Sequence, residues 1–267
     1  MKKVIHKSDL IKVIGKDNVF TRGLASVAMC ALGVNKINKL YAHSAELSDQ
    51  PFTEHMLDVY GITYDKNESE MNVIPKEGPF IIVSNHPFGA IEGIILYDAI
   101  ARVRPDFKVM ANFILSYIPN LKNVFIPVNP FTDKPEWGSS IGGIKEAMAH
   151  ISKGFGLGIF PAGEVSRYNG NKYPEDIDWS VTIAKLAKKA KVPVIPFYFD
   201  GTNSKTFYRL AKMHSMLGTA MLLRELYNKR NHHFTIKIGK PMVPSDLEVY
   251  DDYKKMAAYM RARSYAL

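Results

Sequence analysis

A histidine and a carboxylate that follow a short apolar run are the residues of this chain best suited to acid–base chemistry. His86 lies three residues after the run 80–83, and Glu92 lies six residues beyond the histidine. A neutral imidazole takes a proton from a hydroxyl group, and a carboxylate at its other ring nitrogen fixes the tautomer and stabilises the imidazolium. The pair predicts a general base that activates an alcohol without an acylated serine or cysteine.

The elements around His86 predict that it lies at the edge of a sheet where ligands bind. Residues 80–83 are aromatic and β-branched and end at turn residues, which is typical of a buried strand. The spacing of apolar residues over 90–102 predicts a helix with Glu92 in its first turn. Ligands of open α/β sheets bind at the carboxyl ends of the strands. The simpler alternative is that His86 caps the turn or bonds a backbone carbonyl.

Four sequence blocks resemble those of the glycerolipid acyltransferases typified by lysophosphatidate acyltransferase. The first block is Asn85-His86 with its acid at Glu92. One such block is a weak signal, whereas four in the expected order, covering about residues 78–240, are a strong one. The other three blocks are residues 124–128, 160–166 and 192–196.

The resemblance implies an α/β fold, a glycerolipid acyltransferase-like sheet with flanking helices and an amino-terminal helical element. It also implies direct transfer of a fatty acyl group from an acyl thioester to the hydroxyl of a lyso-lipid, with His86 as the base and Glu92 orienting its ring. A thioester of acyl carrier protein or coenzyme A is the expected co-substrate, and no metal or other cofactor is expected. Backbone N–H groups near Gly89 and Gly163 are candidate donors to the oxyanion.

Three departures from the family pattern bear on the substrate. The acid is Glu92, one residue beyond the family position, where Ile91 stands, so the longer side chain is expected to compensate. The second block ends in Val128, where the family has an arginine that binds the phosphate of the acceptor. In the third block the acid has moved to Glu164 and the nearest basic residue is Arg167. Because an arginine fork binds phosphate bidentately, its loss argues against a phosphate headgroup.

Residues 85–89 and 160–167, together with the later segments 200–204 and 223–226, resemble a bacterial, haemolysin-like branch that acylates lyso-ornithine and lyso-glycine lipids. That resemblance implies an acceptor with a secondary hydroxyl and an amino-acid headgroup. Lysophosphatidate is the alternative acceptor, and a non-catalytic lipid-binding protein of the same fold is the alternative from another class. The predicted substrate-binding residues are Asn85, Gly163, Glu164, Ser166 and Arg167, with Glu164 or Arg167 meeting the ammonium or carboxylate of the headgroup.

The amino-terminal segment is basic and has apolar residues at helical spacing. The chain has a net charge of +9, and its first forty residues hold eight lysines and arginines against Asp9 and Asp17, or +6. A basic amphipathic helix predicts attachment to an anionic membrane surface. The alternatives are that this face packs on the rest of the protein, or that it binds nucleic acid, for which no zinc or aromatic–basic signature exists. The basic residues are Lys2, Lys3, Lys7, Lys12, Lys16, Arg22, Lys36 and Lys39, and the apolar face comprises Leu24, Val27, Ala31, Val34, Ile37, Leu40 and Tyr41.

These features predict that the chain has two parts, and they predict where in the cell the protein lies. Residues 1–70 are expected to form a basic, helical, membrane-associating element, and residues 71–267 the α/β acyltransferase domain. No run approaches the roughly 20 apolar residues of a membrane-spanning helix. The single cysteine, Cys30, excludes an internal disulfide and is expected in the core. We therefore expect a peripheral protein on the cytoplasmic face of the inner membrane.

Strand and helix patterns alternate along the rest of the chain, which is typical of a sheet with helices on its faces. A hydrophobic content of 46% in 267 residues suffices for one large core. Ser245, with Glu248 three residues on, is the predicted cap of the last helix. Strands are predicted at 108–111, 124–128, 157–160, 194–199 and 235–238, and helices at 139–153, 179–191, 207–230 and 245–263.

Overall fold

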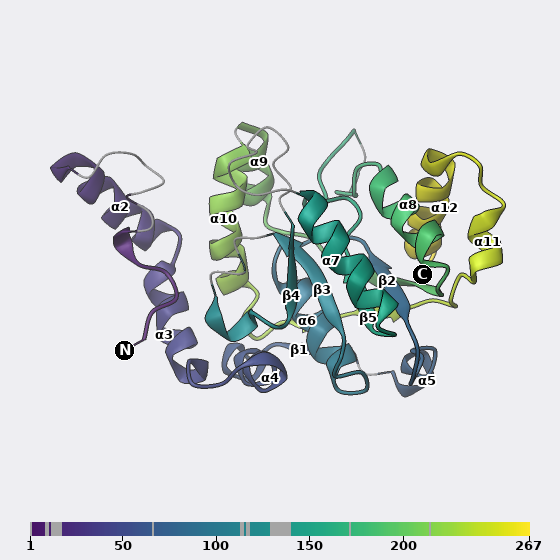
Figure 1. Cartoon of the computed structure of the whole chain (residues 1–267). Coiled ribbons are helices and arrows are strands. Elements are labelled where there is room, and N and C mark those ends of the chain that lie inside the picture. Colours follow the sequence, from purple (N-terminus) through teal and green to yellow (C-terminus); the bar gives the residue numbers. More distant parts are fainter. Residues whose placement is uncertain are drawn as a thin grey trace. The chain divides into compact units, whose positions relative to one another are not determined.

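The computed structural model of the chain divides into two compact units (Figure 1). One comprises Met1–Thr63 with Asn203–His232, and the other comprises Tyr64–Thr202 with His233–Leu267. The predicted division at residue 70 stays a prediction. The structure describes residues 2–8, 11, 18–65, 67–112, 115, 118–128, 140–170, 172–213 and 215–267, so Asp9, Lys12, Lys16, Asp17 and Ser139 lie outside the described residues.

The described elements of the first unit are helices, apart from Thr63, the first residue of a short strand. Asn18 and Thr21 form a capping box at its first helix: Asn18 Oδ1 accepts the Thr21 N–H at 2.9 Å, and the Thr21 hydroxyl accepts the Asn18 N–H at 3.0 Å. That helix ends before Gly33, whose φ of +70° is available to glycine without strain, and the next helix begins one residue later. The helices are α2 (Val19–Ala31), α3 (Val34–Ser44), α4 (Asp49–Tyr60), α9 (Lys205–Met213) and α10 (Ser215–Asn228).

The second unit is built on a mixed sheet with strand order β4-β3-β5-β2-β6-β8. The first five strands in this order pair in parallel, and β8 pairs with β6 in antiparallel. Every residue of β2 is buried, as its continuous apolar run predicts. The predicted α/β fold is confirmed. The strands are β2 (Phe80–Ser84), β3 (Lys108–Asn112), β4 (Phe125–Val128), β5 (Gly156–Ile159), β6 (Val194–Phe199) and β8 (Ile236–Ile238), and a separate two-stranded sheet contains β1 (Thr63–Tyr64) and β7 (His233–Phe234).

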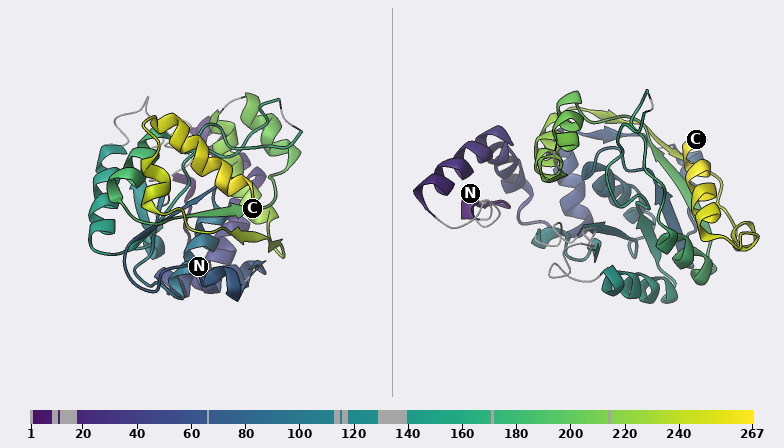
Figure 2. Two further views of the ribbon diagram at one scale, coloured as in Figure 1. Left: turned by 90° about the vertical axis from the view of Figure 1, so that its right-hand side faces the viewer. Right: turned by 90° about the horizontal axis from the view of Figure 1, so that it is seen from above.

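Helices cover both faces of the larger sheet. Ile81 and Val83 of β2 share one apolar core with side chains of α7, α8 and α12, and the yellow helix α12 runs along this face in Figure 2. Helix α6 lies on the other face: a Cβ at Gly158 of β5 would come within 3.1 Å of Leu96, which belongs to this helix. The helices of this unit are α5 (Glu68–Met71), α6 (Ile91–Ala101), the 3₁₀ turn η2 (Pro119–Leu121), α7 (Ser140–Ser152), α8 (Val181–Ala190), α11 (Pro244–Glu248) and α12 (Tyr253–Tyr265).

Residues 207–230, predicted as one helix, form the pair α9 and α10, so that prediction was wrong. The two helices approach closely: a Cβ at Gly218 would lie 2.8 Å from the Cβ of Ala211. Two shorter helices bury apolar surface against each other, which one long helix cannot do.

The helix predicted over 245–263 is also divided, into α11 and α12. Val243, rather than Ser245, precedes α11, and its N–H donates to Asp246 at 3.0 Å. Asp252 caps α12 by accepting a backbone N–H of that helix at 2.7 Å. The Asp252 cap starts a new helix at a point where the pattern of apolar residues predicts one continuous helix.

Helix α2 exposes its part of the apolar face that the sequence identified, whereas Val34 and Ile37 of the same predicted face are buried in α3. Leu24 and Val27 are 45% and 64% exposed, and Phe20 of the same face is 79% exposed. Cys30 is exposed too, so its expected place in the core was wrong, because the buried face of α2 lies elsewhere on the helix. Among the described residues, no helix combines the length and apolar character needed to cross a bilayer. The buried face of α2 consists of Thr21, Ala25 and Met29.

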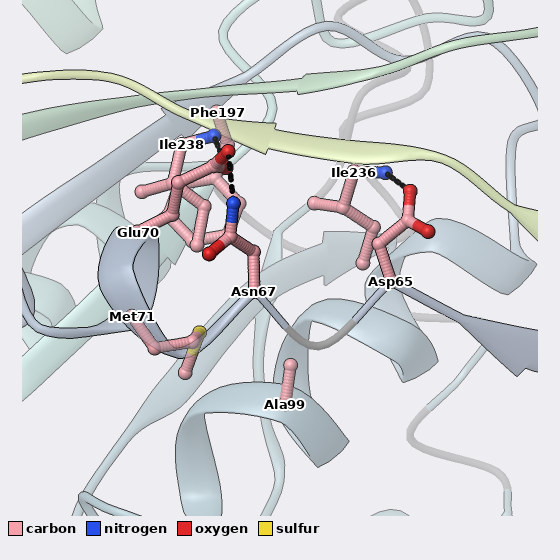
Figure 3. A pocket seen from close by; sticks show the side chains of 8 residues that line it. All are labelled: Asp65, Asn67, Glu70, Met71, Ala99, Phe197, Ile236 and Ile238. Atoms are coloured by element: carbon pink, nitrogen blue, oxygen red, sulfur yellow. Dashed lines mark hydrogen bonds between the residues drawn. The ribbon is translucent and has the colours of Figure 1, made fainter.

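A small cavity lies between α6 and the strands β6 and β8 (Figure 3). Its volume of about 10 Å³ has room for about one water molecule. The Asp65 and Glu70 carboxylates at its rim accept the N–H groups of Ile236 and Ile238 at 3.2 and 3.0 Å. The cavity is therefore too small for a lipid, and its lining does not include His86.

Candidate active site

His86 and Glu92 meet at the carboxyl end of the central strand β2. The chain turns after Ser84 and enters α6 at Ile91, which places Glu92 in the first turn of the helix. The Nδ1 atom of His86 lies 2.8 Å from Oε1 of Glu92. The Glu92 side chain is fully buried, whereas the His86 side chain is 18% exposed, so of the two only the histidine is accessible from solvent.

The turn between β2 and α6 wraps its backbone around the Glu92 carboxylate. Oε1 accepts the N–H groups of Phe88 and Gly89 at 2.9 and 2.7 Å, and Oε2 accepts that of Ala90 at 2.9 Å. Burial by itself raises the pKa of Glu92, but His86 and these N–H groups outweigh it, so the pKa lies below its usual value. The acid is therefore ionised beside the imidazole.

The contact between the two side chains acts mainly through charge. Nδ1 of His86 is buried, and its N–H direction is not aligned with an acceptor although Glu92 lies within hydrogen-bonding distance. Catalytic hydrogen bonds of unliganded proteins are often poorly aligned and tighten when substrate binds. Burial lowers the pKa of His86, but the charge of Glu92 and, to a lesser extent, that of Asp176 raise it above its usual value.

The loop after the neighbouring strand β5 holds the other side of the imidazole. Phe160 stacks on the His86 ring with 4.6 Å between the ring centroids and 28° between the planes. The N–H of Ser166 donates to the carbonyl of His86 at 2.9 Å. Since β2 and β5 are parallel neighbours, their carboxyl ends bring the first and third sequence blocks together.

Two of the predicted substrate-binding residues have side chains that are engaged inside the protein. The Asn85 amide is buried and bonds the backbone of Phe199 twice, donating to its carbonyl at 2.9 Å and accepting its N–H at 2.7 Å. Ser166 is also buried and donates its hydroxyl to Asp176 at 2.6 Å. In this conformation both side chains hold loops in place, and their contact with substrate stays a prediction.

The other three predicted residues lie in the loop after Phe160, nearer the surface. Gly163 is exposed with φ +68°, and a Cβ there would meet no atom within 4 Å. Glu164 and Arg167 form an ion pair with each other, with 36% and 51% of their side chains exposed. A pair so exposed contributes little to stability, so either side chain is available to a ligand at low cost.

The oxyanion donors expected near Gly89 and Gly163 are already engaged. The Gly89 N–H donates to Glu92 at 2.7 Å, and the Gly163 N–H donates to the Phe160 carbonyl at 3.1 Å. In this conformation these two N–H groups bond within the protein, and the oxyanion donors stay a prediction.

Asp176 is a site residue that the sequence did not reveal. It is 3% exposed, and its carboxylate accepts the backbone N–H of His86 at 3.1 Å and the indole N–H of Trp179 at 2.9 Å. It lies ten residues past the third block, in a segment where no local pattern marks it as buried. Only the folded chain brings it to His86.

The buried carboxylate and the partly exposed imidazole thus meet at the carboxyl ends of parallel strands, the arrangement that the sequence predicts for a general base. The chain belongs to the family described as Acyltransferase, whose profile it matches over residues 19–267. The family resemblance seen in the sequence is thereby confirmed.

Curated relatives include two proteins named lyso-glycine lipid O-acyltransferase. Those from Bacteroides thetaiotaomicron and Phocaeicola vulgatus are 31% and 29% identical over alignments of 180 residues that cover 63% of this chain. The match covers 62% and 61% of these relatives, less than two thirds of their length. A crystal structure of the 1-acyl-sn-glycerophosphate acyltransferase PlsC from Thermotoga maritima matches with a TM-score of 0.47 and 17% identity over 85% of each chain.

Proposed function

We propose that this protein transfers a fatty acyl group from a thioester to the hydroxyl group of a lyso-lipid with an amino-acid headgroup, glycine or ornithine. The observation that carries the proposal is the 2.8 Å contact between His86 and Glu92 at the carboxyl edge of the sheet, in a chain of the acyltransferase family. The two relatives named lyso-glycine lipid O-acyltransferase support the acceptor class.

In the proposed reaction, His86 is the general base. Its buried Nδ1 faces Glu92, which leaves Nε2 to take the proton from the acceptor hydroxyl. The oxygen then attacks the thioester carbonyl carbon, the carbon–sulfur bond breaks, and the thiolate leaves with the proton from the imidazolium. General-base assistance of this kind contributes about 10²- to 10⁴-fold to the rate. Glu92 stabilises the imidazolium between the two proton transfers.

The headgroup preference rests on the residues at the sheet edge. Val128 ends β4, where the family pattern has a phosphate-binding arginine. Arg167 offers a positive side chain to the headgroup carboxylate, and Glu164 offers a negative one to the ammonium group that an ornithine headgroup carries on its side chain. Lysophosphatidate, whose phosphate would lack its arginine partner, is the competing acceptor in the experiment below.

The acyl donor in this proposal is a thioester of acyl carrier protein or coenzyme A, and no metal or other cofactor takes part. The proposal places the protein on the cytoplasmic face of the inner membrane, where lyso-lipids are accessible, and gives it no nucleic-acid partner. Support comes from the exposed apolar face of α2 and from the excess of basic residues in the same amino-terminal segment, among them Arg22, Lys36 and Lys39. Each basic residue near an anionic leaflet contributes about 1 kcal/mol to binding.

The test is product formation by the purified protein from an acyl thioester and three acceptors, lyso-glycine lipid, lyso-ornithine lipid and lysophosphatidate. We expect the wild type to acylate the aminolipids in preference, His86→Ala to lose turnover by about 10²-fold or more, and His233→Ala, a control at an exposed histidine, to keep it. Normal turnover by His86→Ala contradicts the mechanism, and a preference for lysophosphatidate contradicts the headgroup assignment. A wild type that binds lipid without forming product supports the non-catalytic alternative.

A further inference from the structure

Asp176 joins the two loops that surround His86. One carboxylate oxygen, Oδ1, accepts the backbone N–H of His86 at 3.1 Å and the hydroxyl of Ser166 at 2.6 Å. The other oxygen, Oδ2, accepts the indole N–H of Trp179 at 2.9 Å. The loop after β2, the loop after β5 and the segment before α8 therefore converge on one buried carboxylate.

Two residues of the carboxyl-terminal helix α12 bind the backbone of Asp176. The Asp176 N–H donates to the hydroxyl of Tyr265 at 2.7 Å, and Arg261 donates to the Asp176 carbonyl at 2.9 Å and to the neighbouring Glu175 carboxylate at 3.0 Å. Asp176 is thus fixed by its backbone as well as its side chain. Because Asp176 is held in this way, its carboxylate also holds in place the three groups that donate to it.

The chemistry of these contacts calls for an ionised acid. Three donors point at two oxygens, and a carboxylate accepts from all of them, whereas an amide in its place would turn an NH₂ group toward one donor. Among the residues that the structure describes, the charged groups that act on His86 are Glu92 of α6 and Asp176. Arg261 and Tyr265 of α12 contact the backbone of Asp176. Asp176 thereby adds a second negative charge beside the imidazole and helps to raise the pKa of His86.

We infer that Asp176 is a positioning residue for His86, which holds the backbone of the histidine and the loop from Phe160 to Ser166 in one arrangement. The inference rests on the proposed role of His86 as the base. Asp176 acts through its hydrogen bonds and does not touch the reacting atoms. Displacing a catalytic group by about 1 Å costs about 10²-fold in rate, so a tie of this kind has a measurable effect on turnover.

The test compares Asp176→Asn with Asp178→Asn, which removes a negative charge from an exposed side chain two residues further on. The readouts are the titration of the His86 ring followed by NMR, and kcat and KM in the acyl-transfer assay. We expect Asp176→Asn to titrate His86 at lower pH and to lose about 10²-fold in kcat with little change in KM, while Asp178→Asn changes neither. If Asp176→Asn titrates and turns over like the wild type, the inference is wrong.

The titration separates this inference from the proposed function. If the wild type transfers no acyl group, a lower His86 pKa in Asp176→Asn still supports the positioning role, and an unchanged pKa still overturns it. If Asp176→Asn does not fold, Ser166→Ala decides the question, because it keeps the Asp176 charge and removes one tie between the loops. We then expect an unchanged His86 pKa with kcat about tenfold lower, and wild-type turnover overturns the inference.

Discussion

Glu92 contacts His86 although it lies six residues after the histidine, one residue further than the acid of the family pattern. The added residue extends the turn, and three backbone N–H groups of that turn close on the Glu92 carboxylate. The longer glutamate side chain then spans the remaining gap to Nδ1, at 2.8 Å. Side-chain length and turn length are therefore coupled in this site.

This coupling predicts that Glu92→Asp is impaired although it keeps the charge. The shorter side chain cannot reach both the turn and the imidazole, so we expect kcat to fall by about 10²-fold. Glu92→Gln keeps the length and loses the charge, and we expect a similar loss of kcat together with about 3 kcal/mol less free energy of unfolding. Steady-state kinetics and urea unfolding measure both effects, with the exposed Glu77→Gln as control. Full activity of Glu92→Asp would show that another group orients the histidine.

The pH dependence of acyl transfer reports the same pair. A general base must be neutral, and the pKa of His86 is raised above its ordinary 6.5, so kcat/KM should rise with pH through a value above 6.5. Removing the Glu92 charge should move this limb to lower pH. An acid limb that stays in place in Glu92→Gln would contradict the assignment.

The contributions of His86 and Glu92 to the free energy of unfolding should change with pH in opposite directions. The folded state favours protonated His86, so its contribution is complete below about pH 6.5 and is lost as pH rises through the raised pKa. The pKa of Glu92 is lowered from 4.5, so its contribution is present above that value and is lost as pH falls through the lower one. Urea unfolding of wild type and His86→Ala at several pH values measures the histidine part.

Much of the sheet, and the helix that follows β2, can be predicted from patterns that are local in sequence. The run at 80–83 predicts a buried strand because each of its residues is apolar, and the structure buries every residue of β2. His86 and Glu92 were found together because a turn and one helical turn separate them. Contacts within one strand–turn–helix unit are fixed by local geometry, and sequence spacing records them.

Contacts between segments far apart in the chain could not be predicted from the sequence, for a physical reason. Asp176 bonds His86 across 90 positions of the chain, and a buried aspartate has the same sequence signature as a surface one. The division of 207–230 into two helices likewise depends on the close approach of Gly218 to Ala211, a tertiary contact. Which side chains pack together decides such features, and the periodicity of one segment does not contain that information.

Adjacent glycines in α7 predict opposite effects of the same substitution. A Cβ at Gly143 would lie 2.5 Å from the Pro127 carbonyl oxygen and 2.6 Å from the Val128 side chain, whereas a Cβ at Gly142 meets nothing within 4 Å. We expect Gly143→Ala to lower the free energy of unfolding by about 1 to 3 kcal/mol through overpacking of the helix on β4. Gly142→Ala should raise it by about 0.5 to 1 kcal/mol, because alanine is the better helix former. Urea denaturation compares the two variants, and equal effects would contradict the close packing of α7 on this strand.

The exposed face of α2 predicts how the protein meets a membrane. Val27 is 64% exposed and lies on the same face as Phe20 and Leu24, whereas Ser26 is exposed beside that face. Val27→Asp and Ser26→Asp add the same charge one residue apart, so the difference between them isolates the apolar contact. Burying a valine side chain contributes about 1.5 kcal/mol, and we therefore expect Val27→Asp to bind phosphatidylglycerol vesicles at least about tenfold more weakly than Ser26→Asp. Binding of the wild type should also weaken as salt screens the basic residues. Equal binding by the two variants in a vesicle sedimentation assay would mean that α2 is not the membrane contact.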